Sequence, residues 1–252
     1  MTASTCIEVL RDGLVTRATL ARPDKGNSLS GHLVRELTDA VEACHADGTR
    51  ALLIDAQGPN FCTGFDLSDL ESETDDSLLA RFVRVELLLQ KVHRAPFVTA
   101  ALAHGKTWGA GADLFAACTM RWATADATFA FPGAAFGLVL GSGRLGALVG
   151  PAHASCWILS GRLVTQPQAS AAGLVQHVVD PAQPTDLEQT LATSVQRLDS
   201  ITQSQVLAAL HPRSEADDAT DLARLVASAA RPGLKERILA YRLATASARP
   251  PK

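Results

Sequence analysis

Two separate stretches of the chain place glycine and small residues shortly after apolar, strand-like segments. The first is Asn60-Phe61-Cys62-Thr63-Gly64-Phe65-Asp66-Leu67, and the second runs from His104 to Leu114. Glycine and alanine let the backbone approach a ligand closely, because no large side chain screens the amide. Two backbone N–H groups that converge on one carbonyl oxygen form an oxyanion hole, often the largest single contribution to catalysis. The two stretches therefore predict a site that stabilises an oxyanion.

The elements that must position these stretches alternate between strand and helix. Apolar and β-branched runs predict strands at 14–20, 51–55 and 97–103, whereas three- and four-residue spacing predicts helices at 30–44, 78–94 and 110–118. This alternation indicates an α/β core. The acidic segment 71–77 is expected to be a mobile surface loop. Beyond Gly150 the pattern is mostly helical, apart from a strand at 175–179.

Composition limits the class of protein. The chain has 252 residues, of which 47% are apolar and 19% charged, with a formal net charge of −3, so we expect a packed core and no nucleic-acid partner. No apolar run reaches the roughly 18–20 residues of a membrane span, and the first residues lack a signal-peptide pattern. We expect a cytoplasmic protein without a membrane partner. Five scattered cysteines form no paired motif, which favours reduced thiols and no metal site.

Three blocks of sequence resemble the crotonase superfamily, the enoyl-CoA hydratase/isomerase-like proteins. They are Arg22-Pro23-Asp24-Lys25-Gly26-Asn27-Ser28-Leu29, the stretch Asn60–Leu67 and the long stretch Gly105–Gly150. The resemblance implies a spiral of repeated ββα units in residues 1–190, which would bind an acyl-CoA thioester. It also implies a C-terminal helical region in residues 191–252, which covers the active site and drives assembly into a homotrimer or a dimer of trimers. Coenzyme A would then be part of the substrate, with no tightly bound cofactor.

The resemblance also implies roles for individual residues. The two oxyanion-hole amides would be those of Phe65 and Ala110, although the family usually has glycine at the second position. Asp113 would be the acid or base. Residues at further matching positions are candidates for contact with the substrate or with coenzyme A: Arg22, Lys25, Cys62, Gly64, Asp66, Leu67, Trp108, Gly109, Pro132, Gly133, Leu140, Ser142 and Arg144.

The chain departs from the family pattern where typical hydratases use two glutamates. The matching positions here are Asp113, one methylene shorter, and Gly133, which cannot transfer a proton. Hydratase or isomerase chemistry with Asp113 as the main acid or base is the first expectation. Decarboxylation or hydrolysis of the thioester is the alternative within the same class, because enolate or oxyanion stabilisation could then suffice. A homologue that binds acyl-CoA without turning it over is the alternative outside it.

Overall fold

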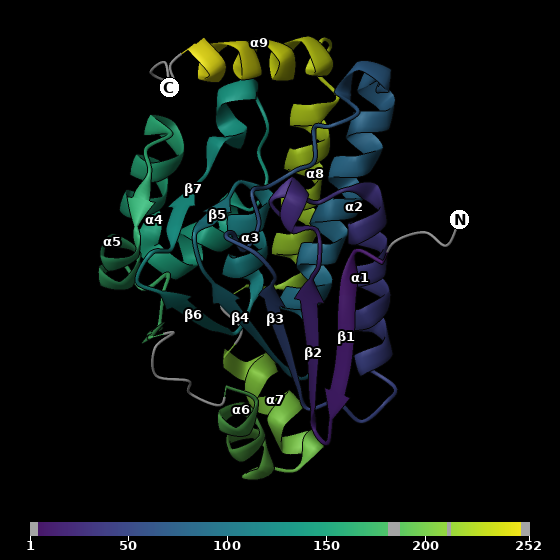
Figure 1. Ribbon diagram of the computed structural model, residues 1–252, viewed down its shortest axis with the longest axis vertical. Helices are drawn as coiled ribbons and strands as arrows, with labels where there is room; N and C mark the ends of the chain where they lie inside the picture. Colours follow the sequence, from purple (N-terminus) through teal and green to yellow (C-terminus); the bar gives the residue numbers. More distant parts are fainter. Residues whose placement is uncertain (1–4, 181–186, 211–212, 248–252) are drawn as a thin grey trace.

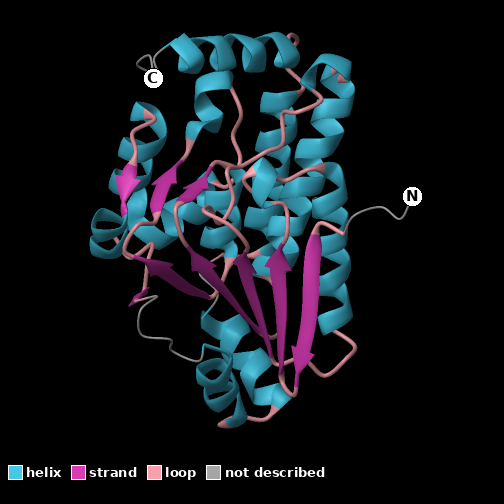
Figure 2. Ribbon diagram, viewed as in Figure 1, coloured by secondary structure: helices cyan, strands magenta, loops and turns pink. Residues whose placement is uncertain are grey.

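A six-stranded sheet forms the centre of the molecule (Figures 1 and 2). The computed structural model describes residues 5–180, 187–210 and 213–247. In spatial order the sheet contains β1 (Ile7–Asp12), β2 (Val15–Leu20), β3 (Ala51–Ala56), β4 (Val98–Ala103), β6 (Met120–Thr124) and β9 (His177–Val179). The edge strand β1 runs antiparallel to β2, and every other neighbouring pair is parallel. Parallel strands need long crossovers, which the helices supply.

A smaller, three-stranded sheet lies beyond the carboxyl ends of the central strands. It consists of β5 (Lys106–Trp108), β7 (Thr128–Ala130) and β8 (Val164–Thr165). Each of β5 and β7 follows a strand of the large sheet after a short turn, so the chain repeats a strand–strand–helix pattern. The units β1-β2-α1 and β4-β5-α3 show it most clearly, and they confirm the predicted spiral of ββα units.

Helices cover both faces of the large sheet. Their bounds are α1 Gly31–Cys44, α2 Asp75–His93, α3 Ala110–Ala117, α4 Ser142–Ser160, α5 Gln166–Ala171, α6 Leu187–Gln196, α7 Ser200–Leu210, α8 Glu215–Ala229 and α9 Leu234–Ser247, with 3₁₀ turns η1 Pro23–Lys25, η2 Leu70–Ser72 and η3 Pro132–Phe136. Leu52 and Ile54 of β3 face the core shared with α1, α2 and α3. Leu53, between them, faces Leu191 and Val195 of α6 on the opposite side.

The C-terminal helices do not form one compact unit. The helices α6 and α7 lie at one end of the molecule, whereas α9 crosses the other end (Figure 1). Helix α8 packs along α2. The predicted division between residues 190 and 191 falls inside α6, and the role of residues 191–252 in trimer formation stays a prediction.

Most predicted elements are confirmed, but the loop expected at 71–77 is wrong. Thr74 and Ser77 form a reciprocal capping box that begins α2 at Asp75. Asp75 and Asp76 therefore lie in the first turn of α2, where the helix dipole favours negative charge. Leu70, just before them, is only 1% exposed and anchors the 3₁₀ turn η2 to the core.

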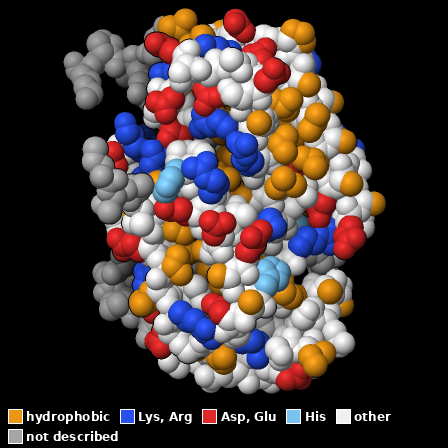
Figure 3. All heavy atoms as spheres, turned by 90° about the vertical axis from the view of Figure 1, so that its right-hand side faces the viewer, with side chains coloured by type: hydrophobic (Ala, Val, Ile, Leu, Met, Phe, Trp, Pro, Cys, Tyr) orange, Lys and Arg blue, Asp and Glu red, His pale blue; other side chains and the backbone are white. Residues whose placement is uncertain are grey.

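The surface carries both signs of charge. Figure 3 shows the right-hand side of Figure 1, where basic and acidic side chains are interspersed near the centre and hydrophobic side chains gather along one flank. This face therefore has no large single-sign field of the kind that attracts nucleic acid. Among the residues that the structure describes, no helix combines the length and the apolar character needed to cross a membrane.

Candidate active site

The two glycine-containing stretches meet, and the contact is between their backbones. Gly64 has φ +105° and Gly109 has φ +54°, conformations that residues with a Cβ adopt only rarely. A Cβ at Gly64 would lie 2.9 Å from the carbonyl oxygen of Trp108 and 3.6 Å from the amide nitrogen of Ala110. The N–H of Trp108 donates to the carbonyl of Cys62 at 2.9 Å, which fixes the register of the two stretches.

The amides of Phe65 and Ala110 are available for a ligand. Within the described part of the chain, neither N–H donates a hydrogen bond to a protein acceptor. Both residues line a cavity of about 170 Å³. The N–H of Ala110 is also the first of α3, where the positive end of the helix dipole adds to its attraction for an anion. This arrangement fits an oxyanion hole.

Contacts of the Phe65 side chain and of the next carbonyl group also hold the Phe65 amide in place. The Phe65 ring stacks on Phe82 of α2, with ring centroids 4.0 Å apart. The Arg81 guanidinium lies 4.3 Å from the centroid of the Phe65 ring. Arg81 also donates to the carbonyl of Asp66 at 2.8 Å. These contacts hold the amide in place, so little reorganisation would be needed to bind an oxyanion there.

The cavity is walled by segments from distant parts of the chain and is mainly apolar. It is lined by Thr63, Gly64, Phe65, Leu67, Phe82, Trp108, Gly109, Ala110, Asp113, Phe131, Pro132, Gly133, Ala134, Phe136, Leu138, Leu140, Gly141, Ser142, Leu145, Ile158 and Tyr241. The structure thus brings together most of the residues predicted from the sequence. Among the described lining residues, only Asp113 and Tyr241 carry titratable side chains.

Asp113 lies three residues after Ala110 on α3, so both belong to the same face of the helix. A Cβ at Gly141 would lie 2.0 Å from a carboxylate oxygen of Asp113, so Gly141 leaves the space which that carboxyl group fills. Burial raises the pKa of Asp113 to about 8; the charge of Arg144 opposes this rise and that of Glu86 adds to it. Asp113 is therefore a carboxyl group in an apolar pocket, and it can gain or lose its proton near neutral pH.

Arg144 does not face the cavity, contrary to the prediction that it contacts the substrate. Its side chain is 1% exposed and pairs with Glu86 of α2 through both carboxylate oxygens, one at 2.8 Å. The ion pair joins α2 to α4, and both of its charges act on the pKa of Asp113. Arginine is suited to this position, because its planar fork matches a carboxylate in two hydrogen bonds.

We expect Glu86→Gln to lower the free energy of unfolding by about 3 kcal/mol, because it leaves the buried Arg144 charge without a counterion. Urea denaturation measures the change. Glu42→Gln is the matched control, since the Lys91–Glu42 pair is exposed and should leave the urea midpoint close to that of the unmodified protein. Equal midpoints for the two variants would contradict a structural role for the buried pair.

Gly133 has no side chain that could transfer a proton, and its surroundings show whether packing requires glycine there. It lies in the 3₁₀ turn η3 at the cavity wall. A Cβ there would make only ordinary contacts with Leu138, at 3.9 Å. Packing therefore does not require glycine at this position, and the cavity has one carboxylate where typical hydratases use two.

The remaining predicted residues lie outside the cavity wall. Arg22 pairs with Asp66 at 2.9 Å and donates to the carbonyl of Ser28 at 2.7 Å, so both charges tie the two loops together. Cys62 is fully buried under α3, and burial raises the pKa of its thiol to about 12. Lys25 is exposed on η1, beside Gly26, whose carbonyl accepts from the N–H of the cavity residue Thr63.

Helix α9 closes one side of the cavity through Tyr241, a residue that the sequence did not indicate. The ring of Tyr241 lies 5.2 Å from that of Phe136. Asp75 accepts hydrogen bonds from three successive backbone N–H groups at the start of α9, those of residues 233–235. Arg242 donates to the carbonyl of Leu67. The first turn of α2 and the last described helix therefore hold each other in place.

The repeated ββα units, with two glycine-containing turns meeting beside α3, define a protein of the crotonase fold. A sequence model described as enoyl-CoA hydratase/isomerase matches residues 11–228, and the chain belongs to this family.

Solved and curated relatives agree with this assignment. A structure from Bordetella parapertussis, provisionally assigned as an enoyl-CoA hydratase/isomerase, is 40% identical with a TM-score of 0.91, covering 98% of this chain and 100% of that one. An enoyl-CoA hydratase/isomerase from Xanthobacter autotrophicus Py2 is 26% identical with a TM-score of 0.81, covering 96% and 93%. YngF of Bacillus subtilis, with the same provisional assignment, is 29% identical over 210 residues, 81% of each chain.

Proposed function

We propose that this protein moves a proton on an acyl-CoA thioester, in an isomerase-type reaction that passes through an enolate. The amides of Phe65 and Ala110 would hold the thioester oxygen, and Asp113 would be the acid and base. The single observation that carries the proposal is the pairing of two available backbone N–H groups with one buried carboxyl group in one apolar cavity.

One carboxyl group is sufficient for this reaction. Ionised Asp113 would take a proton from the carbon next to the thioester carbonyl of a β,γ-enoyl chain. The electron pair then delocalises over the dienolate, whose oxygen the two amides stabilise. Asp113 returns the proton at the γ-carbon, which leaves the conjugated enoyl thioester. Addition of water places a second demand on the site, because a water molecule must be activated as well as a proton delivered. Asp113 would have to meet both demands, since Gly133 offers no carboxylate.

Isotope exchange tests this proposal. The protein is incubated in deuterated water with saturated, enoyl, β-hydroxy and malonyl-type CoA thioesters, and the masses of the products are determined by mass spectrometry. Isomerisation leads to deuterium uptake with a shifted double bond and no added water. Net addition of water would replace isomerase by hydratase, loss of CO₂ would indicate decarboxylation, and free CoA would indicate hydrolysis. Binding without any mass change would overturn the enzymatic proposal.

The pH dependence should report Asp113. Below its pKa of about 8 the carboxyl group is protonated and cannot accept a proton from the substrate. We therefore expect kcat/KM to rise nearly tenfold per pH unit well below 8 and to level off above it. Tyr241 does not interfere, because burial raises the pKa of its hydroxyl further above this range. Activity that instead falls through pH 8 would mean that Asp113 acts first as an acid.

The exposed cation Lys25 is proposed to contact a phosphate group of coenzyme A. It lies on the turn next to Thr63 at the cavity wall. We expect Lys25→Ala to raise KM roughly two- to fivefold with little change in kcat, because an exposed charge pair contributes little. The difference should shrink at high salt. Lys91→Ala, which removes an exposed lysine on α2, is the control, and an equal effect in both variants would refute the assignment.

A further inference from the structure

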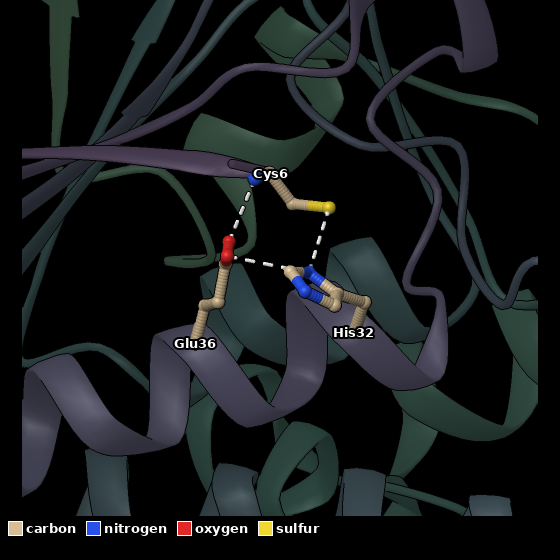
Figure 4. Close-up of side chains that lie close together, drawn as sticks. All are labelled: Cys6, His32 and Glu36. Carbon is tan, nitrogen blue, oxygen red and sulfur yellow. Dashed lines mark hydrogen bonds and ion pairs between the residues drawn. The ribbon is translucent and has the colours of Figure 1, made fainter. Parts of the chain in front are cut away.

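Three chemically different side chains converge at the start of β1, away from the residues that line the cavity. They are Cys6, directly before β1, and His32 and Glu36, one turn apart on α1. Sγ of Cys6 lies 3.2 Å from Nδ1 of His32, and the same nitrogen lies 3.3 Å from Oε1 of Glu36 (Figure 4). One ligand atom from each residue lies within 4.8 Å of the other two. Twenty-six positions separate Cys6 from His32, so no sequence motif indicated the cluster.

A single shared hydrogen stabilises these three side chains less well than a bound metal ion would. A single hydrogen on Nδ1 must be shared between the sulfur and the carboxylate. If that nitrogen is unprotonated, it can accept from the thiol, but its lone pair then faces the oxygen of Glu36. A divalent ion placed among the three atoms would interact favourably with all of them, and a thiolate with a carboxylate would balance its charge.

The S–N and N–O spacings lie within about 0.4 Å of those in a zinc ligand set. With bond lengths of about 2.3 Å to sulfur and about 2.1 Å to nitrogen or oxygen, a tetrahedral ion separates S and N by roughly 3.6 Å and N and O by roughly 3.4 Å. The other oxygen of Glu36 accepts from the backbone N–H groups of Cys6 and Ile7, at 2.7 and 3.1 Å. These bonds orient the carboxylate from outside, as hydrogen bonds to metal-binding side chains commonly do. The His32 side chain is 41% exposed, which gives an ion a route of entry.

We propose that Cys6, His32 and Glu36 bind a zinc-like divalent ion through Sγ, Nδ1 and Oε1. The ion would join the beginning of β1 to the first turns of α1, with water at the fourth position. None of the three residues lines the acyl-CoA cavity, so this site is independent of the proposed reaction.

Zinc and cobalt titrations of the metal-free protein test the site. We expect one equivalent of Zn²⁺ to bind with micromolar or tighter affinity and to raise Tm, and Co²⁺ to give a thiolate-to-metal charge-transfer band. His32→Ala should lower the affinity for Zn²⁺ at least tenfold. Because the His32 side chain is largely exposed, this variant should still fold. Cys6→Ala should abolish the cobalt band.

The control is Cys156→Ser, which removes the exposed thiol of α4 and should leave binding unchanged. The proposal is overturned if Zn²⁺ does not bind to the unmodified protein, or if His32→Ala binds Zn²⁺ as tightly as the unmodified protein does. Isomerase activity is measured in parallel and should survive removal of the metal, so failure of this site and failure of the proposed function are distinguishable.

Discussion

Asp113→Asn should lower kcat by about 100- to 10,000-fold, the range that general acid–base catalysis contributes. Asparagine has nearly the same shape, so it fits the space that Gly141 leaves, but its amide cannot take and return a proton. Affinity for a saturated, unreactive acyl-CoA should stay within about threefold of the unmodified protein, because the two backbone amides are unchanged. Steady-state kinetics with the substrate found by isotope exchange, together with calorimetry, measures both quantities.

Ser142→Ala is the matched control for Asp113→Asn. Ser142 also lines the cavity, and its hydroxyl lies 3.4 Å from the carbonyl of Leu140. Its removal should change kcat by only a few-fold, since it transfers no proton in the proposed reaction. Unchanged turnover in Asp113→Asn would eliminate this residue as the acid or base. If proton exchange were lost but decarboxylation remained, the oxyanion hole would be the working part of the site.

Gly64→Ala should lower kcat by more than about 100-fold, as expected when an oxyanion-hole donor is displaced. The new methyl group would lie 2.9 Å from the Trp108 carbonyl oxygen, and φ +105° is unfavourable for alanine. The backbone must therefore move away from the 109–110 peptide, so the two amides no longer converge. Strain of this kind costs on the order of 1–3 kcal/mol, so Tm should fall as well.

Gly146→Ala controls for the methyl group itself. Gly146 lies inside α4, and a Cβ there meets no atom within 4 Å. Alanine at this helical position should keep full activity and slightly raise the free energy of unfolding. Activity normalised to the folded fraction separates the two effects of Gly64→Ala. Wild-type kcat in that variant would show that the Phe65 amide does not bind the reacting oxygen.

The features that sequence analysis predicted well are local ones. Gly64 lies between β3 and α2, and Gly109 lies between β5 and α3. Short-range sequence patterns were therefore sufficient to identify both glycines as turn residues. Helix α1 has its cap at Ser30, whose hydroxyl accepts from the N–H of Leu33 at 3.1 Å. Strands β6 and β7 were not predicted, because runs of three to five residues carry little periodic signal.

Features that depend on distant partners were missed or misassigned. The family resemblance assigns Arg144 to the cavity wall, but its actual partner is Glu86, which lies 58 positions away and which no local pattern connects to it. Glu86 interrupts an apolar stripe of α2, between Phe82 and Leu89, which was the available sign of a buried charge. Tyr241 carried no sign at all, since its place at the cavity depends on how α9 packs.

The capping of α9 by Asp75 has a consequence for synthesis of the chain. The cavity wall combines residues near position 65 with Tyr241, near the end of the described chain, so the pocket is incomplete until the last helix docks. A nascent chain lacking that helix would hold both glycine turns but leave one side of the pocket open. A ligand that contacts Tyr241 would then favour the finished, docked form by mass action. Such a ligand would therefore stabilise the form of the protein in which α9 is docked.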